Sequence, residues 1–396
     1  RCEHHQLSEG ILIVATNTTN SIRAIRFANG EMTQDELVAV ARVAKSWYKR
    51  VPHSRTACVR TLIVVAAIVL LLPGCVLTSL APLPATVQAE VDGAVDRGFD
   101  GIIVYVDRGD EEALYAAGVQ NRESQAPADP DTLFKIASIS KLYIAAAAVK
   151  AVAGGSLSLD DTLAELMPEL AGRIENSESI TLRLMLQHRS GIPNYVDQSE
   201  FRWFYPPQNA QEALAFVLDK PAAFEPNQKH KYSNTNYVLI GEILDRTLGY
   251  SHHRYVRDEI LTPLGLRNTY SLMSEVDPDD IMSGYDVGDG DYDWKFPSYV
   301  NAGGSMIATA EDTGRFLRAL VEGTLFTDDE QSIYASVYEY EHTGLLPGYQ
   351  SIARYHEDID AVVIQFTNVS GGNRWMRSEA VYRRIVRILR RDGRRT

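Results

Sequence analysis

The serine and lysine of Ser138-Ile-Ser-Lys141 are the side chains best placed by type and spacing to do chemistry. Ala, Leu and Lys dominate the residues that follow until Gly154-Gly155, which predicts a helix over 138–153. Residues three apart share one face of a helix, so the hydroxyl and the amine lie within reach of each other. A buried amine can activate a serine as a nucleophile, and a helix N-terminus can receive the oxyanion that forms on attack.

Taken alone, the Ser-x-x-Lys spacing carries little information. About one or two matches are expected by chance in a chain of this length. A second one, Ser46-Trp-Tyr-Lys49, is present here. A polar start to an Ala-rich helix explains the match at least as well, so companion residues must decide.

Two Tyr-x-Asn triplets lie downstream, Tyr232-Ser-Asn234 and Tyr299-Val-Asn301. We favour the first because it lies in a polar loop just ahead of a helix expected to begin at Val238, and such loops often edge a cleft. An Asx turn that caps this helix is the alternative. A phenol beside a lysine ammonium is easier to ionise than a free phenol and can take a proton from serine.

His342-Thr343-Gly344 is the only His-x-Gly sequence of the chain. It follows a strand predicted over 333–341, and a glycine there lets the backbone approach a ligand closely. An edge strand in this position can present N–H and C=O groups to a substrate. A histidine that merely ends a strand at a turn is an equally good explanation before the context is considered.

In this order the three motifs resemble those of the serine hydrolases related to class C β-lactamases, D-alanyl-D-alanine carboxypeptidases and esterases, with His-Thr-Gly in place of Lys-Thr-Gly. The resemblance covers about residues 85–396. Flanking phrases extend it: Leu186-Gln-His-Arg-Ser-Gly-Ile-Pro193, Tyr232-Ser-Asn-Thr-Asn-Tyr-Val-Leu-Ile-Gly241, Leu261-Thr-Pro-Leu-Gly-Leu266, Ala302-Gly-Gly304 and Pro347-Gly-Tyr-Gln-Ser351. It implies an α/β (α+β) fold, with an antiparallel sheet flanked by helices, a mostly helical insertion at about 156–290, and the site in the groove between them.

The resemblance also implies roles for four residues. Ser138 would be the nucleophile and would form an acyl-enzyme. Lys141 would adjust the protonation of Ser138 and Tyr232, and Tyr232 would act as base and then as acid to the leaving group. Asn234 would bind the substrate and hold Lys141.

On the other side of the groove, the resemblance implies that His342, Thr343 and Gly344 bind the substrate. The N–H groups of Ser138 and Leu345 would form the oxyanion hole. A neutral imidazole at His342 lacks the fixed charge that would receive a substrate carboxylate. We therefore expect esters or small amides to be better substrates than penicillins or peptides, and acidification toward about pH 6 to protonate His342.

The region before the predicted domain suggests export. Residues 1–50 fit an extension upstream of the true start better than a small domain of their own. Residues 51–75 carry basic residues and then an apolar run over 61–72 that is too short to span a bilayer. The run ends in Leu-Pro-Gly-Cys75, which resembles a lipoprotein signal, although its unusual proline leaves other cleavage or an uncleaved anchor open. We expect a lipid anchor on Cys75, a tether over 76–84, and the domain in the periplasm or outside a bacterial cell.

The remaining secondary structure follows from periodicity. Strands are predicted at both ends of the domain and helices between them. The expected strands are 101–106, 113–118, 333–341, 349–355 and 360–367, and the expected flanking helices are 85–97 and 373–391. The last helix is rich in arginine, and a solvated face explains this better than contact with anionic lipid.

Charge and missing motifs exclude other functions. The net charge of −13 argues against binding to nucleic acid. Gly-x-Ser-x-Gly, His-Glu-x-x-His and P-loop motifs are absent, and no cysteine follows Cys75. His252-His253 has no third ligand near it in sequence, so we expect an exposed pair, with no metal and no cofactor. The expected partner is a small ester, amide or peptide substrate, and a non-catalytic penicillin-recognising sensor or cell-wall binder is the alternative.

Overall fold

The computed structural model describes residues 26–27, 30–31, 82–109 and 111–394. The chain divides into two compact units, Arg1–Ala81 and Pro82–Thr396. In the first unit the described residues form one antiparallel pair, β1 (Arg26–Phe27) and β2 (Gly30–Glu31). The rest of the predicted extension, the signal segment with Cys75, and positions 76–81 of the tether lie outside the described residues.

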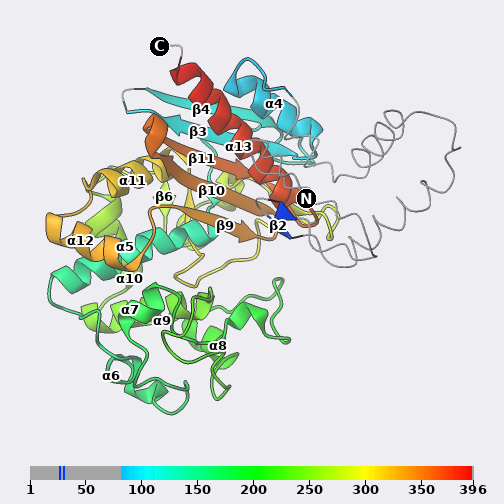
Figure 1. The fold of residues 1–396 in the computed structure, drawn as a ribbon. Helices are drawn as coiled ribbons and strands as arrows, with labels where there is room; N and C mark the ends of the chain where they lie inside the picture. The colour runs from blue at the N-terminus through cyan, green and yellow to red at the C-terminus, as the bar shows by residue number, and fades with distance from the viewer. Residues whose placement is uncertain (1–25, 28–29, 32–81, 110, 395–396) are drawn as a thin grey trace, which may run out of the picture. The chain divides into compact units, whose positions relative to one another are not determined.

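Five antiparallel strands form the main sheet of the second unit (Figure 1). Their order is β4-β3-β11-β10-β9, so strands from the two ends of the unit pair with each other. The predicted strands match four of the five. The bounds are β3 (Gly101–Asp107), β4 (Glu112–Gly118), β9 (His342–Leu346), β10 (Tyr349–His356) and β11 (Ala361–Thr367).

Both faces of this sheet are covered, which explains why every residue of β3 is buried. Ile102 and Val104 pack with α4 (Val87–Asp96) and α13 (Arg374–Gly393). Ile103 and Tyr105 point to the opposite face, because side chains alternate along a strand. That face carries α5 (Ser140–Ala153) and α11 (Ala310–Glu322), and Figure 1 shows the two helix layers on either side of the sheet.

The strand predicted over 333–341 is wrong. Residues Asp328–Val337 form the helix α12, and β9 begins only at His342. A capping box, in which Thr327 and Glu330 each bond the backbone of the other, starts this helix. Tyr334 and Val337, three residues apart, are its buried positions. His342 therefore opens a strand rather than ending one.

Short helices and loops fill the region between the two halves of the sheet. Helix α9 (Asn234–Leu248) begins four residues before the expected start at Val238. The other elements of the unit are β5 (Phe134–Lys135), η1 (Ala137–Ile139), α6 (Leu163–Leu166), η2 (Pro168–Leu170), α7 (Leu182–Leu186), η3 (Tyr195–Asp197), α8 (Ala210–Ala215), α10 (His252–Val256), η4 (Arg257–Leu261), β6 (Thr269–Tyr270), η5 (Met273–Glu275), η6 (Pro278–Asp280), β7 (Tyr285–Asp286), β8 (Ile307–Ala308), η7 (Glu357–Ile359) and β12 (Val369–Ser370).

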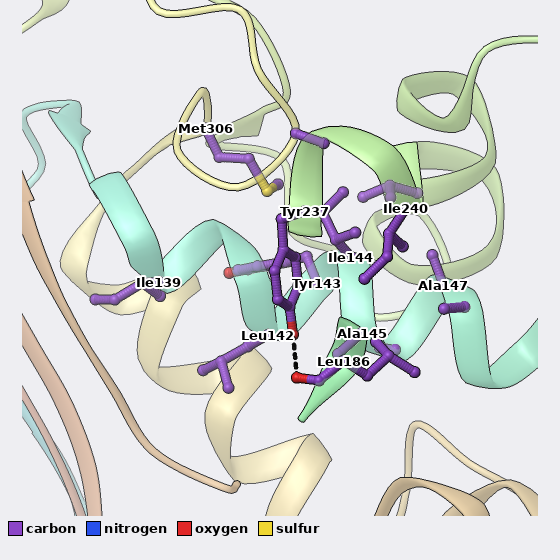
Figure 2. Close-up of a cluster of buried hydrophobic side chains, with 14 of the residues drawn as sticks. Ile139, Leu142, Tyr143, Ile144, Ala145, Ala147, Leu186, Tyr237, Ile240 and Met306 are labelled. Atoms are coloured by element: carbon purple, nitrogen blue, oxygen red, sulfur yellow. Dashed lines mark hydrogen bonds between the residues drawn. The ribbon is translucent and has the colours of Figure 1, made fainter. Parts of the chain in front are cut away.

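Helix α5 is the centre of the core. Its residues 140–149 are all buried, as expected for a helix that is apolar on every side. Figure 2 shows Leu142 and Ile144 of α5 in one apolar cluster with Tyr237 and Ile240 of α9. The Tyr237 hydroxyl donates to the carbonyl of Leu186 at 3.4 Å. These contacts fix α5 and α9 against each other, and the two helices carry the candidate site.

The arginines of α13 are not simply a solvated face. Arg384 is buried and forms an ion pair with the equally buried Glu90 of α4. Arg391 donates to the carbonyls of Pro84 and Ala85. These contacts tie the last helix to the start of the unit. Within the described part of the chain, no helix combines the length and apolar composition needed to cross a bilayer.

Candidate active site

Ser138 lies in the 3₁₀ turn η1, directly ahead of α5, instead of inside one continuous helix from 138. Ala137, the residue before it, has a φ of +52°. This left-handed value is unfavourable for alanine and marks a strained backbone, as is common where a side chain must be presented at a functional site. The turn places the Ser138 hydroxyl near the first turn of α5.

Lys141 is completely buried and points at Ser138. Its Nζ lies 3.2 Å from the Ser138 Oγ. The same Nζ donates to the Asn234 side-chain oxygen at 2.9 Å and to the Gly303 carbonyl at 2.5 Å. Burial lowers the pKa of Lys141 to about 7. At neutral pH the amine is thus present in both its neutral and its charged form.

The phenol of Tyr232 completes the cluster. Its hydroxyl donates to the Ser138 Oγ at 2.9 Å, and the Lys141 Nζ lies 4.9 Å from the centre of its ring. Burial raises the pKa of Tyr232 above its usual value. The expectation that a lysine ammonium makes this phenol easier to ionise is therefore wrong, because desolvation of the phenolate dominates.

Asn234 is the first residue of α9 and is held from behind. Its backbone N–H and its side-chain amide both donate to the side-chain oxygen of Asn194, at 3.0 and 3.3 Å. This leaves the Asn234 oxygen directed at Lys141. The second triplet takes a different position, since Tyr299 and Asn301 line a cavity beside Ser138.

Gly344 lies where β9 passes η1, at the outer edge of the main sheet. A Cβ atom at this position would lie 2.4 Å from the Ile136 carbonyl oxygen and 2.2 Å from the Ser351 hydroxyl. The glycine is thus required by close packing of the protein on itself. Close approach of a ligand to the Gly344 backbone stays a prediction. Leu345, the next residue, is exposed and lines the same cavity as Ser138.

His342 and Thr343 line a different space, a cleft of about 520 Å³ that also borders Tyr232. The Nδ1 atom of His342 lies 2.6 Å from the carbonyl oxygen of Thr343. Burial, together with the nearby Lys141, lowers the pKa of His342 to about 3. The expected protonation of His342 near pH 6 is therefore wrong.

His188 is a part of the site that sequence reasoning missed. Its ring lies 4.4 Å from that of Tyr232, centre to centre, and its Nδ1 accepts from the backbone N–H of Ser233 at 3.3 Å. The Asn236 amide also lies 3.3 Å from this Nδ1. Burial lowers the pKa of His188 to about 2, so its ring stays neutral. The flanking phrase around 186–193 contained the signal, but nothing in it linked the histidine to Tyr232.

The His252-His253 pair is not exposed as expected. His252 is buried, and its Nδ1 lies 2.7 Å from the Asp245 carboxylate. Burial lowers the pKa of His253 to about 3. Over the residues that the structure describes, no group of three or more His, Cys, Asp or Glu side chains could hold a metal ion.

A profile of the beta-lactamase family matches residues 85–387, about three quarters of the chain. The chain belongs to the beta-lactamase family. This result confirms the resemblance and the fold class that the motifs predicted.

Relatives in this family carry several names. Penicillin-binding protein 4* of Bacillus subtilis is 25% identical over 46% of this chain and 40% of its own length. A beta-lactamase of Pseudomonas fluorescens is 28% identical over 47% and 50%, and esterase EstB of Burkholderia gladioli is 29% identical over 49% and 53%. The chain spans about half the length of these curated relatives.

Solved structures agree on the fold. The D-amino acid amidase from Ochrobactrum anthropi SV3, complexed with L-phenylalanine amide, superposes with a TM-score of 0.70 at 24% identity. The match covers 77% of this chain and 98% of the amidase. At this level of identity, the likeness to the amidase establishes the architecture alone.

Proposed function

We propose that this member of the beta-lactamase family is a serine hydrolase that cleaves an ester or an uncharged amide through an acyl-enzyme on Ser138. One observation carries the proposal. The Ser138 Oγ accepts a hydrogen bond from the Tyr232 hydroxyl. It also faces the fully buried Lys141 amine, whose pKa is lowered to about 7. A serine paired with a buried neutral amine has the arrangement needed for nucleophilic catalysis.

In the proposed first step, the neutral Lys141 amine takes the proton of Ser138 while Oγ attacks the substrate carbonyl carbon. This assigns the base role to Lys141 instead of Tyr232, because burial raises the pKa of the phenol and lowers that of the amine. The carbonyl double bond becomes a single bond, and its oxygen carries the negative charge. The backbone N–H groups of Ser138 and Leu345 are the proposed oxyanion donors, since both residues line the same cavity.

In the second step, the bond to the leaving group breaks and the carbonyl re-forms as an acyl-enzyme. Tyr232 gives its proton to the leaving oxygen or nitrogen and recovers one from the Lys141 ammonium. Its raised pKa suits an acid that stays protonated until the leaving group needs it. Water then enters by the same path and releases the acid product, which returns Ser138 to its hydroxyl form.

The proposed substrate class rests on the neutral imidazole of His342. The wall of the site carries an imidazole whose pKa is near 3, where a lysine would offer a full charge to a carboxylate. Relatives named esterase and D-amino acid amidase are compatible with uncharged esters and amides. Short esters are therefore the first substrates to test.

The experiment compares hydrolysis of p-nitrophenyl acetate by wild type, Ser138→Ala and Ser156→Ala, together with labelling by a fluorophosphonate probe. Ser156 is an exposed serine just after α5 and serves as the matched control. Loss of at least about 10³-fold in kcat and loss of labelling in Ser138→Ala alone would support the proposal. Retained hydrolysis in Ser138→Ala would refute it. A wild type that binds a fluorescent penicillin but turns over no ester would favour the non-catalytic sensor or binder.

We also propose export and lipid anchoring through Cys75, with the family domain in the periplasm or outside the cell. This rests on the basic flank, the apolar run and the Leu-Pro-Gly-Cys75 sequence alone. Palmitate incorporation should vanish in Cys75→Ala, and the protein should leave the membrane fraction. Incorporation that persists in the variant would contradict the anchor.

A further inference from the structure

We propose that the leaving-group side of the site recognises a hydrogen-bond donor, such as a carboxamide or a hydroxyl, through the Nε2 atom of His342, and disfavours a carboxylate. This inference rests on the proposed function and deepens it by naming the chemistry of the leaving group. A lysine at this position would donate a hydrogen bond to the substrate, whereas His342 would accept one from it.

The position of the cleft identifies which half of a substrate enters it. Tyr232 donates to the Ser138 Oγ and, in the proposed mechanism, to the leaving atom. The centres of the Tyr232 and His342 rings lie 6.1 Å apart, and both residues line the cleft of about 520 Å³. A group that leaves beside Tyr232 therefore extends toward His342.

The hydrogen bond of His342 to its neighbour fixes the role of its other nitrogen. A carbonyl oxygen can only accept, so the Nδ1 atom that lies 2.6 Å from the Thr343 oxygen carries the proton. In a neutral imidazole, the Nε2 atom then has no proton, so it carries a lone pair and can only accept a hydrogen bond. The lowered pKa of His342 supports the neutral ring. The ring also lies nearly parallel to that of Tyr338, at 17°, which holds its orientation.

The charges around the cleft point the same way. Its two arginines have partners, since Arg189 donates to Asn227 and Arg354 forms a bidentate ion pair with Glu379. The carboxylates of Glu339 and Glu341 also line the cleft, and Glu341 lies 3.8 Å from Arg354. A substrate carboxylate would thus meet a lone pair and like charges, whereas an N–H or O–H would meet acceptors.

A matched pair of substrates tests this inference: the O-acetyl esters of 3-hydroxypropanamide and of 3-hydroxypropanoate. They share the acyl group and differ only in a terminal carboxamide or carboxylate. We expect kcat/KM of the wild type to favour the carboxamide by at least about tenfold at pH 7 and physiological ionic strength. His342→Lys should lower that ratio by about tenfold or invert it, because an ammonium donates and carries charge.

His253→Gln is the matched control, since His253 lies on α10, outside the cleft. It should keep both the activity and the ratio of the wild type. A wild type that prefers the carboxylate overturns the inference without any variant, and so does a folded His342→Lys with an unchanged ratio. Hydrolysis of neither ester, with no fluorophosphonate label on Ser138, would instead refute the proposed function and the inference with it.

Discussion

Strand β9 has two different environments at its two ends. At His342 and Thr343 it borders the polar cleft, which holds histidine, arginine and glutamate side chains. At Leu345 and Leu346 it borders a cavity of about 60 Å³ with several aromatic walls, and none of the described residues that line this cavity is charged. A hydrogen bond joins Tyr232, which lines the cleft, to Ser138, which lines the cavity. With the proposed mechanism, this difference predicts that the two halves of a substrate are selected separately, a short apolar acyl group on one side and a polar leaving group on the other.

The cavity is also the more firmly closed of the two. The ring centres of Trp203 and Tyr299 lie 5.9 Å apart in an edge-to-face contact, and those of Phe204 and Trp294 lie 4.3 Å apart. These contacts join the loop near 203 to the loop near 295. Aromatic pairs of this kind each contribute about 0.5–1.5 kcal/mol beyond the burial of their surface. A long acyl chain would have to separate Trp203 from Tyr299, which both line the cavity.

Among the changes that test this comparison, the largest effect is expected at Gly344, which lies in β9 between Thr343 of the cleft and Leu345 of the cavity. Gly344→Ala places a methyl group against the Ile136 carbonyl and moves β9 away from η1. Because both the cavity and the cleft depend on this contact, kcat/KM for p-nitrophenyl acetate should fall by about 100-fold or more. The melting temperature should fall as well, whereas Gly304→Ala, whose methyl group meets nothing within 4 Å, should melt like the wild type. Normal kinetics in Gly344→Ala would show that the cavity and the cleft do not depend on the contact between β9 and η1.

The cavity side can be changed alone by Trp203→Ala. Removing the indole opens the space beside Ser138, so the ratio of kcat/KM for p-nitrophenyl hexanoate to that for the acetate should rise about tenfold. The carboxamide-to-carboxylate preference should stay as it is. Tyr205→Ala is the control, because Tyr205 is 84% exposed and lines neither space. A change in leaving-group preference in Trp203→Ala would show that the two sides are not independent.

The pH profile separates Lys141 from the two neutral histidines. Lys141 has a pKa lowered to about 7, so its neutral form is lost as the pH falls through that value. Between pH 8 and pH 6, this loss of neutral Lys141 should lower kcat/KM about tenfold. His188 and His342 have pKa values lowered to about 2 and 3 and add no further step in this range. A rate that rises on acidification would contradict this assignment.

The smallest effect is expected from the cleft side, behind Tyr232. His188→Asn keeps an acceptor for the Ser233 N–H and tolerates the positive φ of 54° at this position, but it loses the ring that packs on Tyr232. We expect kcat to fall about fivefold with little change in KM, because His188 acts through Tyr232 as a positioning residue. His253→Asn should show no change. A rise in KM alone would instead place His188 in contact with substrate.

Much of this architecture could be predicted from local sequence. The Ala-rich helix ending near Gly154, the strands on either side of the tight turns, and the motif order that led to the family all lie in short stretches of chain. The prediction of a strand over 333–341 was wrong because Tyr and Glu alternate near the end of this segment, a pattern typical of strands. The capping box at Thr327 and Glu330 starts a helix there instead.

The properties of the site that depend on distant contacts could not be predicted. The pKa values of Lys141 and Tyr232 are set by burial among segments that are far apart in sequence. Gly344 is required by the Ile136 carbonyl, more than 200 residues earlier. Contacts of this kind can be read only from the packed fold, whereas the motifs in the sequence were enough to identify which residues form the site.

An acyl group carried by Ser138 is the intermediate on which the proposed function depends, and it can be trapped. The wild-type protein would be mixed with p-nitrophenyl acetate, quenched in acid within milliseconds, and digested for peptide mass mapping. We predict a single acetyl group on Ser138, absent from Ser138→Ala and unaffected by Ser156→Ala. Rapid release of p-nitrophenol with the acetyl group on another residue, or with the same rate in Ser138→Ala, would contradict it.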